Sequence, residues 1–241
     1  MSASIASLSD LEPLVLVGSR AGLFLLEPDA GWACRGPLLP GLDVSHAVRD
    51  RRDGTLWAAA NDAGGHARVC RSDDGGATWD GGALPGERAW HVREGRNGEV
   101  YAGVKPAGLL RSDDRGRSWQ PVLGLNDHPT RGEWWEGGAG LVLHTILLPP
   151  GRNGRIYAGI SVAGLFRSDD GGATWCEARA GLPAGEHNVL RDAMAASGGA
   201  GVEPTVVFGT TAGTLYASRD GGERWEAVAS GLGRIQSVEA G

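Results

Sequence analysis

The chain has 241 residues, with 41 glycines, 12 prolines and a formal net charge of −6 at pH 7. Its length suits one domain, and glycine and proline spread along the chain suit many tight turns. Charges of both signs are mixed without a basic stripe, which argues against nucleic acid as a partner. The longest apolar run, residues 141–148, is broken by His144 and Thr145 and is too short to cross a bilayer.

The N-terminal residues lack the basic start and the sustained apolar core of a secretion signal, so we expect a cytoplasmic protein. Its three cysteines, Cys34, Cys70 and Cys176, are odd in number and have no CxxC spacing. This argues against both a disulfide framework and a zinc knuckle. We expect all three to be buried free thiols on outer strands of different repeats.

Five short apolar runs recur along the chain and predict one strand each. They are residues 14–18, 56–60, 100–104, 156–160 and 206–210. A second apolar run follows each, and after four of these the pattern Ser-x-Asp-x-Gly-x-x-Trp appears. Asp and Ser side chains bind nearby backbone N–H groups and Gly accepts positive φ, so the pattern predicts a tight turn between two strands. The positions that define the four turns are Ser72, Asp74, Gly76, Trp79, Ser112, Asp114, Gly116, Trp119, Ser168, Asp170, Gly172, Trp175, Ser218, Asp220, Gly222 and Trp225.

A further strand is predicted just before each apolar run from the second onward. We expect residues 191–196 to belong to such a strand, not to a helix, because they occupy this place in the repeat. The first apolar run has no such strand before it, and the C-terminal residues 234–239 supply the missing copy. The residues at equivalent positions of the aligned strands are His46, His91, His144, Arg191 and Gln236.

The serines of the four turns are 40, 56 and 50 residues apart, and a period of this size predicts a ring of small sheets. We therefore expect a single all-β domain over residues 1–241, a five-bladed β-propeller of four-stranded antiparallel blades. Residues 234–240 are expected to pair with the N-terminal blade, because this closure removes an exposed sheet edge. The blades are expected at about residues 11–35, 44–82, 89–122, 142–178 and 188–228.

The four turns resemble Asp boxes, also called bacterial neuraminidase repeats, which occur in sialidases and in many β-propellers that are not sialidases. Residues 22–25, 131–138 and 190–194 resemble phrases of bacterial sialidase-like repeat proteins. The chain is similar to these proteins over nearly its whole length, as a short form with fewer blades that is either natural or shortened by design. The resemblance implies a propeller with the Asp boxes at outer hairpins, away from any substrate.

A sialidase mechanism is not expected. Sialidases resemble one another in an arginine triad, a Tyr/Glu nucleophile pair and an Asp acid/base. The tyrosines of this chain, Tyr101, Tyr157 and Tyr216, all fall in predicted strands, and the spacing of its arginines supports no triad.

In a propeller the inner strands start at one mouth of the channel, on the face opposite the Asp boxes. His46, His91 and His144 would meet there as candidates for a divalent metal, because neutral imidazoles bind Zn, Cu, Ni or Fe. Arg191 in the same ring would repel a cation and would suit a carboxylate or phosphate, and Gln236 completes the ring. The alternative is that each histidine binds the backbone of a neighbouring strand. Further candidates at this rim are Arg20, Asn61, Asp62 and Lys105.

The longest insertion between blades is residues 126–140, which we expect to fold over the channel mouth. Exposed tryptophan rings stack on sugars, and a pair of carboxylates is what glycosidases use. The alternative is that the tryptophans form a small core of the loop itself and the glutamates cap backbone amides. The candidates in this loop are Arg131, Trp134 and Trp135 for a ligand, and Glu133 and Glu136 for catalysis.

The residues thus favour a module that binds a small anionic or sugar-like ligand at the channel mouth, rather than an enzyme. Two alternatives stay open: a scaffold or shortened propeller without activity, and a glycoside hydrolase or lyase that uses Glu133 and Glu136. We expect a monomer without a cofactor, a nucleic-acid partner or a membrane partner. A divalent metal at the ring histidines is the exception that the sequence leaves open.

Overall fold

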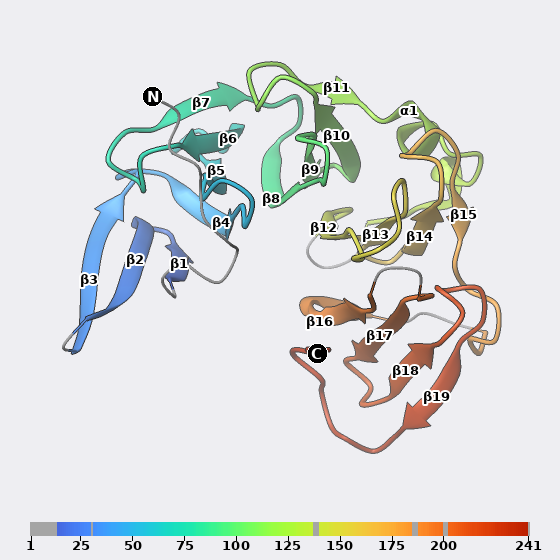
Figure 1. The fold of residues 1–241 in the computed structure, drawn as a ribbon. Helices are drawn as coiled ribbons and strands as arrows, with labels where there is room; N and C mark the ends of the chain where they lie inside the picture. The colour runs from blue at the N-terminus through green and yellow to red at the C-terminus, as the bar shows by residue number, and fades with distance from the viewer. Residues whose placement is uncertain (1–13, 30, 137–139, 185–187, 200–201, 241) are drawn as a thin grey trace. The chain divides into compact units, whose positions relative to one another are not determined.

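The computed structural model describes residues 14–29, 31–136, 140–184, 188–199 and 202–240, which are almost entirely β-strands (Figure 1). The strands form five antiparallel sheets, each built from strands that follow one another in the sequence. This arrangement confirms the predicted all-β fold with five blades. Within these ranges the helices α1 (Leu123–Asn126) and η2 (Arg131–Glu133) are too short to span a membrane.

The first sheet has three strands and the other four have four strands each. The first consists of β1 (Val15–Ser19), β2 (Gly22–Asp29) and β3 (Gly31–Leu38). The second consists of β4 (Asp43–Arg49), β5 (Leu56–Asn61), β6 (Ala67–Ser72) and β7 (Asp80–Ala83). The third consists of β8 (Arg88–Glu94), β9 (Val100–Lys105), β10 (Gly108–Ser112) and β11 (Gln120–Pro121).

The fourth sheet consists of β12 (Leu143–Leu147), β13 (Ile156–Ile160), β14 (Gly164–Ser168) and β15 (Cys176–Glu177). The fifth consists of β16 (Val189–Ser197), β17 (Thr205–Thr210), β18 (Leu215–Ser218) and β19 (Glu226–Ala229). Strand β16 confirms that residues 191–196 are extended and not helical.

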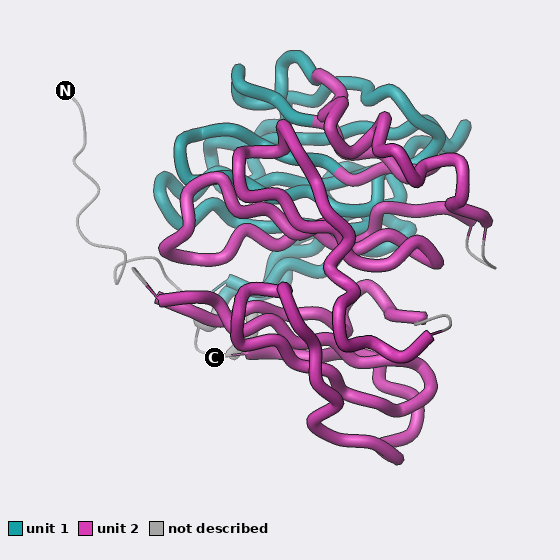
Figure 2. Tube along the Cα trace, turned by 90° about the vertical axis from the view of Figure 1, so that its right-hand side faces the viewer, with its two compact units in different colours: residues 1–102, 111–119 teal, residues 103–110, 120–241 magenta. Residues whose placement is uncertain are grey.

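The chain divides into two compact units (Figure 2). The first unit contains the first two sheets, β8 and residues 111–119, and the second contains residues 103–110 with the fourth and fifth sheets. Each unit has its own apolar core. Leu23, Leu25 and Leu56 are buried in the first, and Tyr157, Phe208 and Trp225 in the second.

The four repeated turns are closed by the same side-chain bonds. In the first, Ser72 Oγ donates to Asp74 Oδ1 at 2.8 Å and accepts the Gly76 N–H at 2.7 Å. The Asp74 carboxylate also accepts the Thr78 N–H at 2.9 Å. Equivalent bonds close the other three turns, so Ser and Asp at these positions have a structural role.

Glycines near the ends of β1 and β9 let the next sheet approach closely. A Cβ on Gly18 would stand 2.7 Å from the carbonyl oxygen of Val44 in β4, and one on Gly103 would stand 2.6 Å from that of Leu143 in β12. Both contacts join one sheet to the first residues of the following sheet's inner strand. Only glycine leaves room for this contact, because any Cβ would overlap the backbone oxygen.

The C-terminal segment differs from its prediction. Residues 234–240 form no strand, and the first sheet has three strands within the described ranges. The Ile235 N–H donates to Thr210 O at 3.3 Å and the Val238 N–H to Asp192 O at 2.7 Å, so this segment lies on the fifth sheet. In the part of the chain that the structure describes, the first sheet therefore lacks the fourth strand that residues 234–240 were predicted to supply.

The cysteines are free thiols, as expected, but they are not all buried. Cys70 on β6 is buried, whereas Cys34 and Cys176 are exposed. Cys34 and Cys176 lie on the outermost strands of their sheets, where one face meets solvent, and Cys70 lies one strand further in. Burial raises the pKa of the Cys70 thiol to about 11, which makes it unreactive at neutral pH.

Candidate functional site

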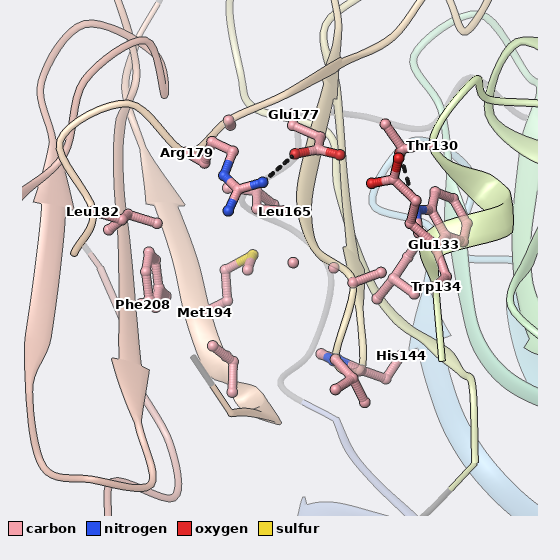
Figure 3. Close-up of a pocket in the computed structure, with 17 residues that line it drawn as sticks. Thr130, Glu133, Trp134, His144, Leu165, Glu177, Arg179, Leu182, Met194 and Phe208 are labelled. Atoms are coloured by element: carbon pink, nitrogen blue, oxygen red, sulfur yellow. Dashed lines mark hydrogen bonds and ion pairs between the residues drawn. The ribbon is translucent and has the colours of Figure 1, made fainter. Parts of the chain in front are cut away.

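A cavity of about 200 Å³ lies between the fourth and fifth sheets, wholly within the second unit (Figure 3). Strands β13 and β14 and the turn between them form one wall, and β16 and β17 contribute to the other. The end of β15 with the residues that follow it, up to Leu182, and the loop around η2 complete the rim. The side chains labelled around it are Thr130, Glu133, Trp134, His144, Leu165, Glu177, Arg179, Leu182, Met194 and Phe208.

Three charged side chains border this cavity. Arg179 Nη1 donates to Glu177 Oε2 at 3.0 Å, and the Glu177 side chain is the less exposed of the two. Glu133 is exposed, and no bond from its carboxylate to another described residue is recorded. With one carboxylate paired and one unpaired, the bordering groups have a formal charge of −1.

The loop that carries Trp134 is held by a short hydrogen-bond chain. The Thr130 N–H donates to His128 Nδ1 at 3.3 Å, so this nitrogen carries no hydrogen and acts as an acceptor. The Thr130 hydroxyl, 2.9 Å from the same nitrogen, therefore also donates to it. The Trp134 Nε1–H donates to Thr130 Oγ1 at 3.1 Å. The indole packs on Phe166 of β14 with 4.9 Å between ring centroids, and the Arg131 guanidinium lies over it at 5.0 Å.

Trp134 thus packs on the fourth sheet through Phe166 and also borders the cavity. Trp135 is 51% exposed, and neither it nor Glu136 borders the cavity. The predicted carboxylate pair is therefore divided: Glu133 borders the cavity and Glu136 does not. Residues 137–139 lie outside the described residues.

His144 at the floor of the cavity is a neutral imidazole with a defined tautomer. Thr145 Oγ1 donates its one hydrogen to Arg191 O at 2.9 Å, so it must accept the hydrogen of His144 Nδ1, also at 2.9 Å. Nε2 is left as a hydrogen-bond acceptor. Burial, and then the charge of Arg191, lower the pKa of His144 to about 4.

The predicted ring of equivalent residues has a different register in the structure. His46 pairs with Ala59 of β5, whereas Thr145, and not His144, pairs with Gly159, the corresponding residue of β13. The register of β16 shifts between Val189 and Met194, so Arg191 lies in an irregular stretch. The alignment was wrong by one residue at His144. Both strands have a β-bulge at this point, at Ser45 in β4 and at His144 in β12, so His144 corresponds to Ser45 and Thr145 to His46.

The remaining ring members are placed as follows. His46 and His91 stack in the first unit with ring centroids 3.9 Å apart. Gln236 is exposed. Among the residues that the structure describes, no group of three or more histidine, cysteine or acidic side chains could hold a metal ion. Asn61, a predicted rim residue, is buried and accepts the Ala89 N–H at 2.7 Å, so it joins two strands instead.

Sequence reasoning missed Glu177, Arg179, Met194 and Phe208 as cavity residues. Glu177 and Arg179 follow a turn tryptophan by two and four residues, where the pattern predicts only an outer strand. The spacing of Glu177 and Arg179 was a signal that could have indicated them, because charged residues two apart at the end of a strand project to the same side. Nothing in the sequence distinguishes Met194 and Phe208 from ordinary core residues of a strand.

Comparisons with known proteins agree on the fold. No family model matches the chain. The structure is similar to a GH74 xyloglucanase from Xanthomonas campestris, with a TM-score of 0.65 and 24% identity over 91% of this chain and 36% of that one. It is similar to an ancestral GH74 enzyme, with a TM-score of 0.63 and 16% identity over 94% of this chain and 31% of that one.

Two further likenesses cover less of this chain. YCF48 from Cyanidioschyzon merolae has a TM-score of 0.51 and 18% identity, over 79% of this chain and 57% of that one. A probable oligoxyloglucan-reducing end-specific xyloglucanase from Neosartorya fischeri is 30% identical over 78 residues, which are 32% of this chain and 9% of that protein. The chain thus spans a minor part of the xyloglucanases that it resembles, and the structural likenesses support a β-propeller fold.

Proposed function

We propose that this chain binds a small neutral carbohydrate in the cavity between its fourth and fifth sheets. The observation that carries the proposal is the composition of that cavity, in which apolar walls meet a few polar groups at the rim and floor. Small-molecule sites have this composition, because apolar walls supply contact area and a few polar groups set orientation.

The polar groups match the hydroxyls of a sugar. Glu133 and Glu177 accept hydrogen bonds, Arg179 donates them, and His144 Nε2 offers an acceptor at the floor. Leu165, together with Met194 and Phe208, supplies an apolar surface for the C–H face of a sugar ring. A volume of about 200 Å³ is below the range of about 300–1,000 Å³ for drug-sized ligands, so we infer a single sugar ring or chain end.

The charge of the cavity favours a neutral ligand over the anion that was expected from Arg191. Arg191 does not border the cavity, and Arg179, the arginine that does, is already paired with Glu177. The unpaired Glu133 carboxylate would repel a second negative charge. The likeness to proteins named as xyloglucanases gives independent support for a carbohydrate.

Glycoside hydrolysis is the second candidate, because two carboxylates, Glu133 and Glu177, border one cavity. Glycosidases act through two carboxyl groups that flank the scissile bond. In a hydrolase of this kind Glu133 and Glu177 would be the catalytic pair, in place of the pair Glu133 and Glu136 suggested by the sequence.

Isothermal titration calorimetry with glucose, xylose, galactose, glucuronate and xyloglucan oligosaccharides tests binding. We expect saturable heat with a neutral sugar and at least about tenfold weaker binding by Glu177→Gln, because one half-buried, charged hydrogen-bond acceptor is weakened. Glu226→Gln is the matched control. Glu226 lies on β19, does not border the cavity, and forms an exposed ion pair with Arg219. The absence of saturable heat with every sugar would contradict the proposal.

Release of reducing ends from the same oligosaccharides tests hydrolysis. If the second candidate holds, turnover is lost in both Glu133→Gln and Glu177→Gln and persists in Glu136→Gln. Saturable binding without turnover supports the binding module alone.

A further inference from the structure

A second cavity, in the first unit, is bordered mainly by hydrogen-bond donors. It has a volume of about 380 Å³ and is lined by Arg71, Arg115 and Arg117, by Trp57, and by residues of β6, β7 and the turn before Trp119. We propose that this donor-lined cavity binds an oxyanion of the phosphate or sulfate class. The site lies in the other unit from the sugar cavity and does not depend on the function proposed there.

The three guanidinium groups keep donors that the neighbouring carboxylates do not use. Arg71 Nε donates to Asp73 Oδ1 at 3.0 Å, and Arg115 Nη2 contacts the same oxygen at 3.1 Å, so two arginines share this carboxylate. Arg115 also contacts Asp53 Oδ2 at 3.1 Å. For the guanidinium of Arg117, no bond to another described residue is recorded. Free donor capacity therefore remains at the cavity.

Two indole N–H groups beside the cavity also lack acceptors. Trp57 is only 3% exposed, and its Nε1 has no hydrogen-bond partner within the described part of the chain. The buried Nε1 of Trp119 likewise has none, and it lies 3.9 Å from where a Cβ on Gly82, a lining residue, would stand. Buried indole N–H groups normally find an acceptor.

The other turn tryptophans show that this lack of acceptors is specific to one place. Trp79 Nε1 donates to Gly76 O at 3.2 Å, and Trp175 Nε1 donates to Gly172 O at 2.9 Å. Trp225 donates to Ala178 O at 2.9 Å. Trp119 alone among the four turn tryptophans has no recorded acceptor, and it is the one beside the cavity with three arginines.

Charge repulsion points to the same kind of ligand. Burial lowers the pKa of Arg71, the nearby charges of Arg115 and Arg117 lower it further, and the smaller effects of Asp80 and Asp53 oppose them. Asp80 is the one carboxylate in the lining. A bound anion would relieve this repulsion, and three or more oxygens would suit several donors better than the two oxygens of a carboxylate. Phosphate, sulfate and their monoesters share this chemistry.

Thermal unfolding of the full chain with inorganic phosphate, inorganic sulfate or glucose 6-phosphate tests the proposal, with acetate and chloride at matched ionic strength as references. Ligand bound only by the folded state raises Tm with concentration. We expect phosphate or sulfate to raise Tm above both references. The glucose 6-phosphate arm shows whether the site accepts an ester as well as the free ion.

Arg117→Ala should weaken anion binding by about ten- to a hundredfold, since a charge-assisted contact is lost. Arg219→Ala is the matched control, because Arg219 holds an exposed position in the turn of the fifth sheet. In NMR spectra, assigned with Trp57→Phe and Trp119→Phe, the two indole N–H signals should shift when phosphate is added. Equal Tm shifts in wild type and Arg117→Ala, or unmoved indole signals, would overturn the proposal.

Discussion

Ile235 covers Gly209 on the fifth sheet so closely that a Cβ on the glycine would collide with the isoleucine side chain. Gly209 lies near the end of β17, as Gly18 and Gly103 lie near the ends of β1 and β9. Val44 and Leu143, which approach those two glycines, begin the inner strands of the following sheets. Ile235 thus takes the place that the inner strand of a following sheet takes elsewhere.

Gly209→Ala should therefore displace the C-terminal segment and lower the free energy of unfolding by about 1–3 kcal/mol, the usual cost of overpacking. Hydrogen exchange of the Ile235 and Val238 amides should become faster, because their bonds to Thr210 O and Asp192 O depend on this contact. Unchanged exchange at both amides would contradict the prediction.

Two variants control this measurement. Gly199→Ala places a Cβ in open space, so it should leave stability and exchange unchanged. The double variant Gly209→Ala/Ile235→Ala removes the colliding side chain, and it should recover part of the loss as a coupling between neighbours.

Asn61 joins β5 to β8 through its carboxamide. Its Nδ2 donates to Ala89 O at 3.1 Å, its Oδ1 accepts the Ala89 N–H, and both residues are buried. Asn61→Ala leaves two buried backbone groups without partners, so we expect a loss of roughly 2–6 kcal/mol at about 1–3 kcal/mol per group. Urea unfolding measures this change. Asn97→Ala, at an exposed site, should have little effect, and equal losses in the two variants would argue against the bridging role.

The sequence period was enough to predict the sheets and turns, because each repeat carries its own local signals. Apolar runs and the Ser, Asp and Gly positions act within a few residues of each other, and the structure places a closed turn at all four. The strands and turns could therefore be predicted from residues that lie close together in the sequence.

The sequence predicted the candidate site much less well than the strands, because the site depends on contacts between sheets. Thr145 takes the place predicted for His144, which lies in the bulge of β12 where β4 has Ser45, and repeats of unequal spacing do not show such a shift of one residue. Glu133 and Glu177 are far apart in the sequence and border one cavity only because the loop around η2 packs on β14. Asn61 appeared to be a rim residue because an amide suits a ligand and a buried bridge equally well.

The aspartates of the turns should make stability fall in strong acid. Bonds from the turn hydroxyls and backbone N–H groups hold the pKa values of Asp114 and Asp170 at about 2. Because these values are below the pKa of about 3.9 for an unfolded aspartate, the stabilisation is present above about pH 4 and is lost as pH falls through 2. Carboxyl chemical shifts in an NMR titration measure the two pKa values directly. Values near 4 at both positions would contradict the prediction.

His144 should give the protein a second loss of stability in weaker acid. Its pKa of about 4 lies below the value of 6.5 for an unfolded histidine, so the unfolded chain takes up a proton first as pH falls. The stabilisation is complete above about pH 6.5 and decreases until pH 4, by roughly 3 kcal/mol, since each pKa unit is worth about 1.4 kcal/mol. Urea unfolding at several pH values should show this slope. It should vanish in His144→Asn and persist in His66→Asn, because the His66 side chain is 78% exposed; a slope that persists in His144→Asn would assign the effect to other groups.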